Sequence, residues 1–270
     1  MKKDLNEITT LVVDIGNTMT AAGFFKGKKL IDKDTHPSDQ KEISLEEIEN
    51  HAINFAKRNP ELRKIDYSLV SSVVPGLTRI SQIIIQHNND VEPHVLKLDM
   101  VKNLKMKIDN PNEVGGDLLA DLVGATNYYG GPCVIIDLGT VSKFLAVDEN
   151  NCFVGASFAP GLKSSFNALS GTTALLPPID ALKVSTSDEV PFIYGKNTID
   201  CMKSGIYWSC VAYVNDIATR IEKTLGKNVK KILTGGYAKF VLNGLDKDKY
   251  ILDEDLVLKG LNLIALENIK

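Results

Sequence analysis

The sequence predicts an α/β protein of two similar halves, each a mixed sheet flanked by helices. One apolar, β-branched run ends in Asp14 and turns on Gly16, and a second ends in Asp137 and turns on Gly139. Such runs favour buried strands, and glycine lets the backbone approach a bulky anion that a Cβ would exclude. A hairpin and then alternating helices and strands follow each motif. One motif alone would be explained by a β-turn, but two predict half-domains facing each other across a phosphate-binding cleft.

The first half begins with the strand that ends at Asp14. Gly27 divides two short β-prone runs, which predicts a hairpin of residues 20–25 and 28–31. Apolar residues at helical spacing predict a helix over 45–57, and a Pro-Gly pair favours the start of a helix over 77–86. Short apolar runs predict strands over 67–73 and 95–98.

The second half is expected to open on a helix over 117–129, which stops at a Gly-Gly-Pro before the strand of Asp137. It then repeats the first plan, with strands over 144–147 and 152–158 and a helix that follows Pro160 and Gly161. Prolines favour a loop over 172–191. A long apolar stripe predicts a core-packed helix over 198–225. A strand is expected over 229–233, and it ends in a glycine turn where adenosine could contact the backbone without side-chain obstruction. The last expected element is a capped helix over 256–268.

The boundary between the halves has no low-complexity linker. We therefore place it near residues 112–114 and expect tight packing across it. The resulting domains cover residues 1–113 and 114–270.

Composition excludes several classes of function. The 270 residues are 44% hydrophobic and 24% charged with a net charge of −3, so the chain lacks the basic field that nucleic acid attracts. No apolar run suits a membrane span or a secretion signal, so we expect a cytoplasmic protein without nucleic-acid or membrane partners. The four cysteines lack Cys-x-x-Cys spacing and are expected to be buried thiols. The four histidines are expected at the surface rather than on a metal.

The two motifs suit phosphoryl transfer, which needs a phosphate cradle, a cation and a group that handles the acceptor proton. Backbone N–H groups of residues 16–18 are candidates for the cradle. Asp14 could reach a hydrated Mg²⁺ and Asp137 a second cation, because carboxylates suit hard ions, while Thr140 could contact a phosphate. The sequence Gly-x-x-x-x-Gly-Lys-Ser/Thr is missing, which argues against a P-loop.

A further candidate lies in the segment 110–117, where a proline and paired glycines deliver Asp117 to the first turn of a helix. The helix dipole favours an ionised carboxylate there, and such a group could accept a proton from a substrate alcohol. Aspartate is also a preferred helix cap, so this residue alone leaves a purely structural role open.

Eight motifs follow one another in an order that is specific when they are taken together. They are Asp14-Ile-Gly-Asn-Thr18, Ser71-Ser-Val-Val-Pro75, Asn110-Pro-Asn-Glu-Val-Gly-Gly-Asp117, Asp137-Leu-Gly-Thr140, Gly155 to Pro160-Gly161, Gly195-Lys-Asn-Thr198, Ser204-Gly205 and Thr234-Gly-Gly236. In this order the chain resembles type III pantothenate kinases nearly end to end. The resemblance implies two ribonuclease H-like domains of the actin-like, sugar-kinase-like ATPase superfamily. It also implies a homodimer that uses ATP to phosphorylate pantothenate to 4′-phosphopantothenate, the first step of coenzyme A synthesis.

Carried over to this sequence, the resemblance also implies roles for individual residues. Asp117 would accept the proton of the pantothenate hydroxyl, and Thr198 would hydrogen-bond the substrate. Asp137 would bind a monovalent cation, K⁺ or NH₄⁺, and Asp14 would hold Mg²⁺ through water. The ATP-binding residues would be Asp14, Ile15, Gly16, Asn17, Thr18, Met19, Thr20, Ala21 and Thr140, and the substrate pocket would contain Gly115, Gly116, Asp117, Leu118 and Thr198.

Three positions depart from the family pattern. Leu118 stands where the family has arginine, and leucine cannot replace a guanidinium that pairs with a carboxylate. Ile108 stands where a tyrosine is expected, which removes a hydroxyl. Lys143 stands where the family has threonine; it would either supply a compensating charge or be exposed, and exposure is favoured because lysine is rarely buried.

These departures leave two alternatives to a pantothenate kinase. One is a non-catalytic relative that keeps the fold and acts through a protein partner. The other is a kinase for a different small hydroxylated acid or amide, because Leu118 and Ile108 make the pocket more apolar. In each case the helix over 198–225 is a candidate dimer interface.

Overall fold

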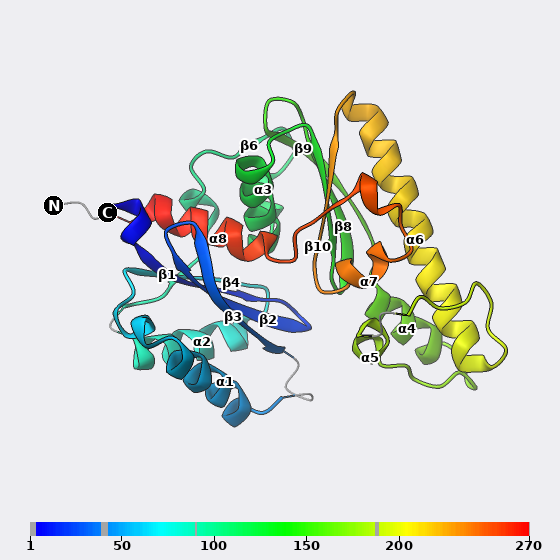
Figure 1. Ribbon diagram of the computed structural model, residues 1–270, viewed down its shortest axis with the longest axis horizontal. Coiled ribbons are helices and arrows are strands. Elements are labelled where there is room, and N and C mark those ends of the chain that lie inside the picture. Colours follow the sequence, from blue (N-terminus) through cyan, green and yellow to red (C-terminus); the bar gives the residue numbers. More distant parts are fainter. Residues whose placement is uncertain (1–3, 39–42, 90, 187–188, 270) are drawn as a thin grey trace. The chain divides into compact units, whose positions relative to one another are not determined.

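The computed structural model describes residues 4–38, 43–89, 91–186 and 189–269 (Figure 1). The chain divides into two compact units. Unit 1 comprises Met1–Leu104, Asp109–Asn127 and Leu256–Lys270, and unit 2 comprises Lys105–Ile108 and Tyr128–Asp255. This division differs from the boundary expected near residues 112–114, because α3 (Gly116–Tyr128) and α8 (Leu256–Asn268) pack on the sheet of unit 1.

The described part of unit 1 contains a sheet with the strand order β3-β2-β1-β4-β5. β1 (Thr9–Ile15) pairs antiparallel with β2 (Met19–Lys26) and parallel with β4 (Tyr67–Ser72), and β3 (Lys29–Pro37) and β5 (His94–Val95) form the edges. The predicted hairpin around Gly27 is confirmed and extends further than expected. The strand expected over 95–98 ends early, because Leu98–Met100 forms a 3-10 turn.

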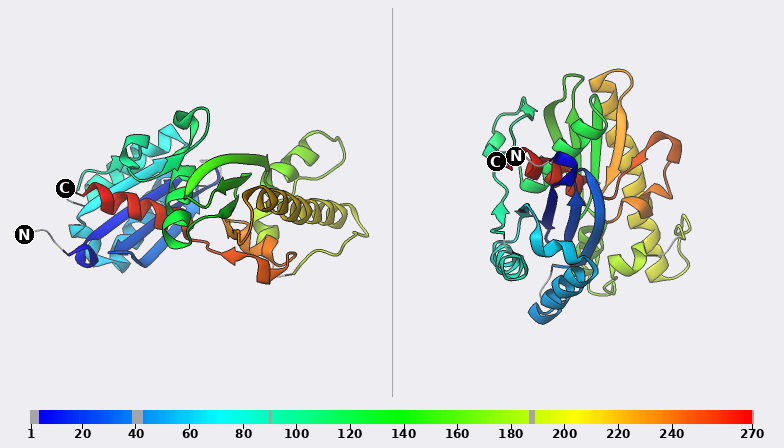
Figure 2. Two further views of the ribbon diagram at one scale, coloured as in Figure 1. Left: turned by 90° about the horizontal axis from the view of Figure 1, so that it is seen from above. Right: turned by 60° about the vertical axis from the view of Figure 1, so that its left-hand side comes forward.

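Side chains that alternate along β1 point to opposite faces of this sheet. Leu11 and Val13 pack with α1 (Leu45–Arg58) and α2 (Pro75–Asn88), whereas Val12 packs with α3 and α8. Figures 1 and 2 show α1 and α2 on one face and the red α8 on the other. Two helices therefore cover each face, as the mixed α/β pattern predicts.

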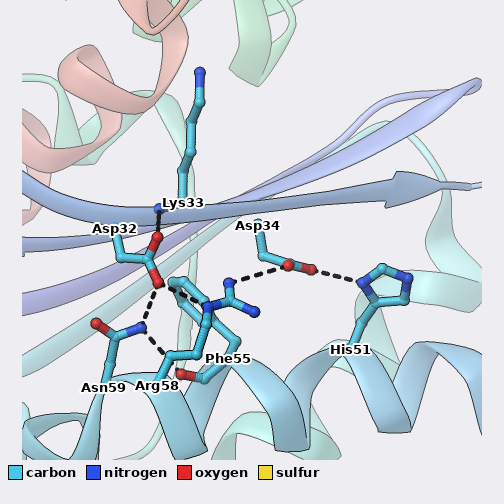
Figure 3. Close-up of polar contacts among 7 residues, drawn as sticks. All are labelled: Asp32, Lys33, Asp34, His51, Phe55, Arg58 and Asn59. Atoms are coloured by element: carbon cyan, nitrogen blue, oxygen red, sulfur yellow. Dashed lines mark hydrogen bonds and ion pairs between the residues drawn. The ribbon is translucent and has the colours of Figure 1, made fainter.

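A polar network attaches α1 to β3 (Figure 3). His51 Nδ1 lies 2.8 Å from an oxygen of Asp34, and the guanidinium of Arg58 reaches both Asp32, at 3.2 Å, and Asp34, at 3.3 Å. Asn59 donates to Asp32 at 2.7 Å. Burial acts to raise the pKa of Asp32. The hydrogen bonds from Asn59 and Arg58 act in the opposite direction and together outweigh burial, so the net shift of this pKa is downward.

The described part of unit 2 repeats this plan with the strand order β11-β10-β7-β8-β9-β6. Three antiparallel strands correspond to β1, β2 and β3, and these are β7 (Cys133–Leu138), β8 (Val141–Val147) and β9 (Cys152–Pro160). Two parallel strands correspond to β4 and β5, and these are β10 (Lys230–Thr234) and β11 (Ile251–Leu252). The duplication expected from the two motifs is therefore present. β6 (Lys105–Met106), which pairs with β9, has no counterpart in the strand order of unit 1.

The long helix α6 (Thr198–Leu225) packs its apolar stripe on this sheet, as predicted, and Tyr207, Val211 and Val214 are buried there. Figure 1 shows α6, in yellow, running along the sheet. The predicted loop over 172–191 contains a short helix, α5 (Ala181–Ser185), because Asp180 caps it by accepting from two backbone N–H groups. The remaining helices of unit 2 are α4 (Leu162–Gly171) and α7 (Ala238–Leu242).

The expected burial of the cysteines is confirmed for Cys133, Cys152 and Cys210, whereas Cys201 is exposed. His51 is half-buried and paired with Asp34, unlike the surface position that its polar neighbours favoured. In the part of the chain that the structure describes, no helix is both long enough and apolar enough to cross a membrane.

Candidate functional site

The turn between β1 and β2 carries the predicted phosphate-binding residues of unit 1. Its first N–H group, that of Gly16, donates a 3.0 Å hydrogen bond to the carbonyl of Met19. This N–H closes the turn and is therefore occupied within the chain, contrary to its expected place in the cradle. Asn17 is exposed at the tip of the turn, so this residue is accessible to a ligand.

Two other residues of the predicted segment 14–21 point into the protein. Ile15 is 1% exposed and belongs to the apolar core. Thr20 is also buried, and its hydroxyl lies 2.8 Å from the hydroxyl of Ser38. These side chains support the turn from beneath, and a motif alone does not separate such supports from residues that face a ligand.

The carboxylate of Asp14 and the start of α3 lie at the same end of the sheet. Ser71 of β4 is the parallel neighbour of Asp14. It is 1% exposed, and its Oγ has no hydrogen-bond partner among the described residues. Gly116 begins α3 so close by that an added Cβ would lie 2.9 Å from Ser71 Oγ. Glycine at this position thus brings the helix of Asp117 down onto the strand next to Asp14.

Asp117 occupies the first turn of α3, as predicted. A 3-10 turn, Pro111–Glu113, leads into the helix, and Asn110 caps that turn and donates to Glu113 at 2.9 Å. The Asp117 carboxylate folds back so far that an added Cβ on Gly115 would lie 2.7 Å from its Oδ1. The carboxylate therefore lies at the positive end of the helix dipole.

Two more residues of α3 bear on this site. Leu118 is half-buried, and it follows Asp117 directly. Asp121, which the sequence analysis missed, is 2% exposed and lies one helical turn after Asp117 on the same face. A carboxylate within the otherwise apolar run of residues 118–125 was the available signal.

In unit 2, Asp137 stands near the end of β7 between two strands. Its parallel neighbour on β10 is Thr234, and its antiparallel neighbour on β8 is Lys143. Gly235 has a φ of +89°, and an added Cβ there would overlap Asp137 Oδ1 and lie 2.7 Å from the backbone N of Leu138. Only glycine fits this crossing, so Gly235 packs against the carboxylate, whereas an added Cβ on Gly236 would meet nothing within 4 Å.

Lys143 is not exposed as the sequence analysis favoured. Its ammonium donates to Asp137 Oδ2 at 2.6 Å, and the two side chains are only 18% and 14% exposed. Of the two roles considered for Lys143, the structure therefore contains the less favoured one, a positive charge placed at the site. This pairing depends on the length of the turn, because the first motif, with a turn one residue longer, pairs Asp14 with Ala21.

Thr140, in the turn between β7 and β8, is held through its carbonyl oxygen. This oxygen accepts from the N–H of Gly161 at 3.1 Å and from the hydroxyl of Ser164 at 2.7 Å. Both donors belong to the start of α4, so the helix fixes the turn that follows Asp137. The hydroxyl of Thr140 remains the group predicted to contact a phosphate.

Thr198 is placed differently from these residues. It is the first residue of α6 and is exposed, next to Asn197, whose side chain caps the helix. The preceding segment lines an open groove of about 950 Å³, and Phe192, Ile193 and Tyr194 of this segment are strongly exposed. Thr198 thus follows an exposed apolar segment in the chain and is not part of the turn around Asp137.

The motif order that carries these residues is matched by known proteins. The family model described as type III pantothenate kinase matches residues 10–220. The chain belongs to the type III pantothenate kinase family. A type III pantothenate kinase of Dehalococcoides mccartyi strain 195 is 30% identical over 261 residues, which cover 96% of this chain and 97% of the relative. One of Acidiphilium cryptum is 35% identical over 204 residues, which cover 76% and 74%. The resemblance predicted from the motifs is confirmed.

Solved structures show the fold of this type III pantothenate kinase. A Campylobacter jejuni protein described as a Baf family transcriptional activator aligns with a TM-score of 0.56 at 20% identity, over 96% of this chain and 98% of that one. MreB 5 of Spiroplasma citri aligns with a TM-score of 0.50 at 10% identity, over 95% of each chain. The predicted actin-like ATPase fold is thereby confirmed, and identities this low establish the fold alone.

Proposed function

We propose that this type III pantothenate kinase transfers the γ-phosphoryl group of ATP to the hydroxyl of pantothenate, giving 4′-phosphopantothenate and ADP. Family membership over most of the chain supports ATP-dependent phosphorylation in coenzyme A synthesis and does not favour a non-catalytic relative. The observation that carries the proposal at the level of residues is the packing of Gly116 on Ser71. It sets Asp117 at the end of the strand neighbouring that of Asp14.

The proposed role of Asp117 is to accept the proton of the acceptor hydroxyl. As the hydroxyl oxygen bonds to the γ-phosphorus, the bond from that phosphorus to the β–γ bridging oxygen breaks, ADP departs, and the proton moves to the carboxylate. A base must be ionised to act in this way. Asp117 lies in the first turn of α3, at the end of the helix that carries positive partial charge.

The proposed role of Asp14 is to hold Mg²⁺ through water. Carboxylate and hydroxyl oxygens suit this ion, and the register places Ser71 directly beside Asp14, so the residues present fit it. Bound Mg²⁺ would offset phosphate charge. The backbone N–H of Asn17, an exposed residue, would bind a phosphate oxygen, and Thr140 of unit 2 would contact ATP, as its motif suggests.

A monovalent metal ion at Asp137 does not fit the residues present. The ammonium of Lys143 already binds one oxygen of that carboxylate at 2.6 Å, and the other oxygen faces Gly235. We therefore assign no step of the reaction to K⁺.

The substrate pocket of the proposed kinase includes Gly115, Gly116, Asp117 and Leu118. Leu118 presents an apolar side chain next to the base, where the family pattern has a cation. The carboxylate of pantothenate would then be bound by another group or more weakly. The acceptor class remains a small alcohol in either case, because Asp117 and its packing are retained.

A homodimer is the proposed assembly, and the cytoplasm, where ATP is available, is the proposed compartment. The exposed apolar residues before α6 support the dimer, since Phe192 is 89% and Tyr194 is 72% exposed. Such residues would lose water contact on association, and Thr198 lies next to them. Sedimentation of the wild type against a Phe192→Ser variant tests this surface.

The experiment that tests the function is ADP release by the purified protein with ATP, Mg²⁺, KCl and pantothenate. We expect turnover, and we expect Asp117→Asn to lower kcat by about 10² to 10⁴-fold with little change in ATP affinity. Asp109→Asn is the matched control, because Asp109 is an exposed carboxylate outside the proposed site. No turnover at saturating pantothenate would refute the function, and an unchanged kcat in Asp117→Asn would refute the base.

A further inference from the structure

Lys143 and Asp137 form an ion pair at the place where the motif predicts a bound monovalent cation. The distance from Lys143 Nζ to Asp137 Oδ2 is 2.6 Å. The side chains are 18% and 14% exposed, so water screens this pair far less than a pair on the surface.

The strand register keeps the ammonium in this position. Asp137 and Lys143 are direct neighbours on β7 and β8. The residues on either side of Lys143 point to the opposite face, where Phe144 is fully buried and the hydroxyl of Ser142 lies 2.9 Å from that of Tyr213. Because side chains alternate along a strand, moving Lys143 to the opposite face of the sheet would require the core residues to leave the core.

The Asp137 carboxylate is closed on its other side as well. Its Oδ1 faces Gly235, whose positive φ and crowding against the backbone of Leu138 leave no space for a side-chain atom. One oxygen therefore meets an ammonium and the other meets backbone. A metal ion entering here would have to bind a carboxylate whose charge the Lys143 ammonium already neutralises, and that ammonium would repel the ion.

We infer that the Lys143 ammonium replaces the monovalent cation of this site, so that the protein binds nucleotide and turns over without K⁺. A primary ammonium carries the same single charge as K⁺ or NH₄⁺, and here it is tethered to the chain. It neutralises Asp137 and keeps one positive charge at the turn that bears Thr140. This inference rests on the proposed function for its role in turnover, but its structural content is independent of the acceptor.

The test compares wild type with Lys143→Met, which removes the charge and keeps the aliphatic stem. The Kd of a non-hydrolysable ATP analogue with Mg²⁺ is measured by calorimetry in KCl and in choline chloride at equal ionic strength. We expect the wild-type Kd to be the same in both salts, within about twofold, and Lys143→Met to bind about tenfold more tightly in KCl than in choline chloride. Lys223→Met, at an exposed lysine of α6, should behave like the wild type.

A second readout needs neither nucleotide nor turnover. Melting temperatures in KCl and in choline chloride should agree for the wild type, and KCl should raise that of Lys143→Met, since an ion bound only by the folded state stabilises it. Asp137→Asn added to Lys143→Met should remove the K⁺ response. Lys143→Arg keeps the charge and should stay independent of K⁺.

The outcomes separate this inference from the proposed function. If the wild type needs K⁺ to bind nucleotide, the inference is overturned, whether or not pantothenate is phosphorylated. This measurement does not depend on the folding of any variant. A Lys143→Met protein that folds but gains no response to K⁺ would also overturn it. Nucleotide binding independent of K⁺ without pantothenate turnover would refute the function and leave standing the inference that Lys143 replaces the cation in nucleotide binding.

Discussion

The glycine turn after β10 gives the sharpest stability prediction, for the substitution Gly235→Ala. Gly235 has a φ of +89°, and an added Cβ would lie 2.7 Å from the N and 2.8 Å from the C of Leu138. Those atoms are backbone at the end of β7, so they cannot rotate away. The Cβ would also overlap the carboxylate of Asp137, which Lys143 holds on its other side.

The two effects of this substitution add. A non-glycine residue at such a φ costs about 1 to 3 kcal/mol. Forcing a methyl group into a filled space costs about 1 to 3 kcal/mol more. We therefore expect Gly235→Ala to lower the free energy of unfolding of unit 2 by about 2 to 6 kcal/mol, which is a large share of the stability of a typical domain.

The assay is urea denaturation followed by tryptophan fluorescence. The chain has one tryptophan, Trp208, which lies in α6 and packs on the core of unit 2, so its signal reports this unit. The matched control is Gly236→Ala, because an added Cβ on Gly236 meets nothing within 4 Å. It should be neutral or stabilise by up to about 1 kcal/mol. Equal midpoints for the two alanine variants would refute the crowding around Asp137.

Three further predictions test other parts of the chain. Asp32→Asn should destabilise the protein at neutral pH but not in acid. The lowered pKa of Asp32 stabilises the fold at pH values above its ordinary value of 3.8, and this stabilisation is lost as the pH falls through the lowered pKa. A stability difference from wild type that does not change with pH would contradict this prediction. One thiol, that of Cys201, should react with a disulfide reagent in the native protein and four should react in urea, because the other three are buried. Burial also raises the pKa of Cys133 to about 12, so rapid labelling of Cys133 in the native protein would refute this prediction. Leu118→Arg should lower the KM for pantothenate by about tenfold, since a charge-assisted hydrogen bond contributes about 1.5 to 3 kcal/mol. Leu118→Met is its control, and an unchanged KM in Leu118→Arg would show that another group already pairs with the carboxylate.

The sequence predicted those parts of the fold whose cause is local. The bounds of α6 and α8 agree with the predicted ranges, because a capping Asn197 precedes one helix and a long apolar pattern runs through both. The short strands β6 and β11 were missed, since two-residue strands have no period and depend on partners distant in sequence. The placement of α3 and α8 in unit 1 was missed for the same reason: their contact with each other, through Gly260 and Ala120, is not a local property.

The candidate site was predictable as a set of residue types and less so as a set of contacts. The motifs identified Asp14, Asp117 and Asp137, and the structure places each at a strand end or in a first helical turn. They did not show that the N–H of Gly16 is used within its own turn, or that Ser71 separates Asp14 from α3. Those facts depend on the pairing of strands, which one motif does not contain.

The two copies of the repeated motif share one order of strand, carboxylate and turn, and they differ in the charge of the residue opposite the carboxylate. Asp14 lies between a hydroxyl residue of the parallel neighbour, Ser71, and the antiparallel neighbour Ala21. Asp137 lies between Thr234 and Lys143 in the equivalent positions. The turn after Asp137 is one residue shorter than the turn after Asp14, so the residue that faces the carboxylate across the strands differs between the two copies. Ala21 brings no charge to Asp14, which suits a carboxylate proposed to attract Mg²⁺, whereas Lys143 brings a full positive charge to Asp137. The duplication thus supplied two similar carboxylate turns, and one cross-strand residue in each made the first a candidate metal site and the second an internal ion pair.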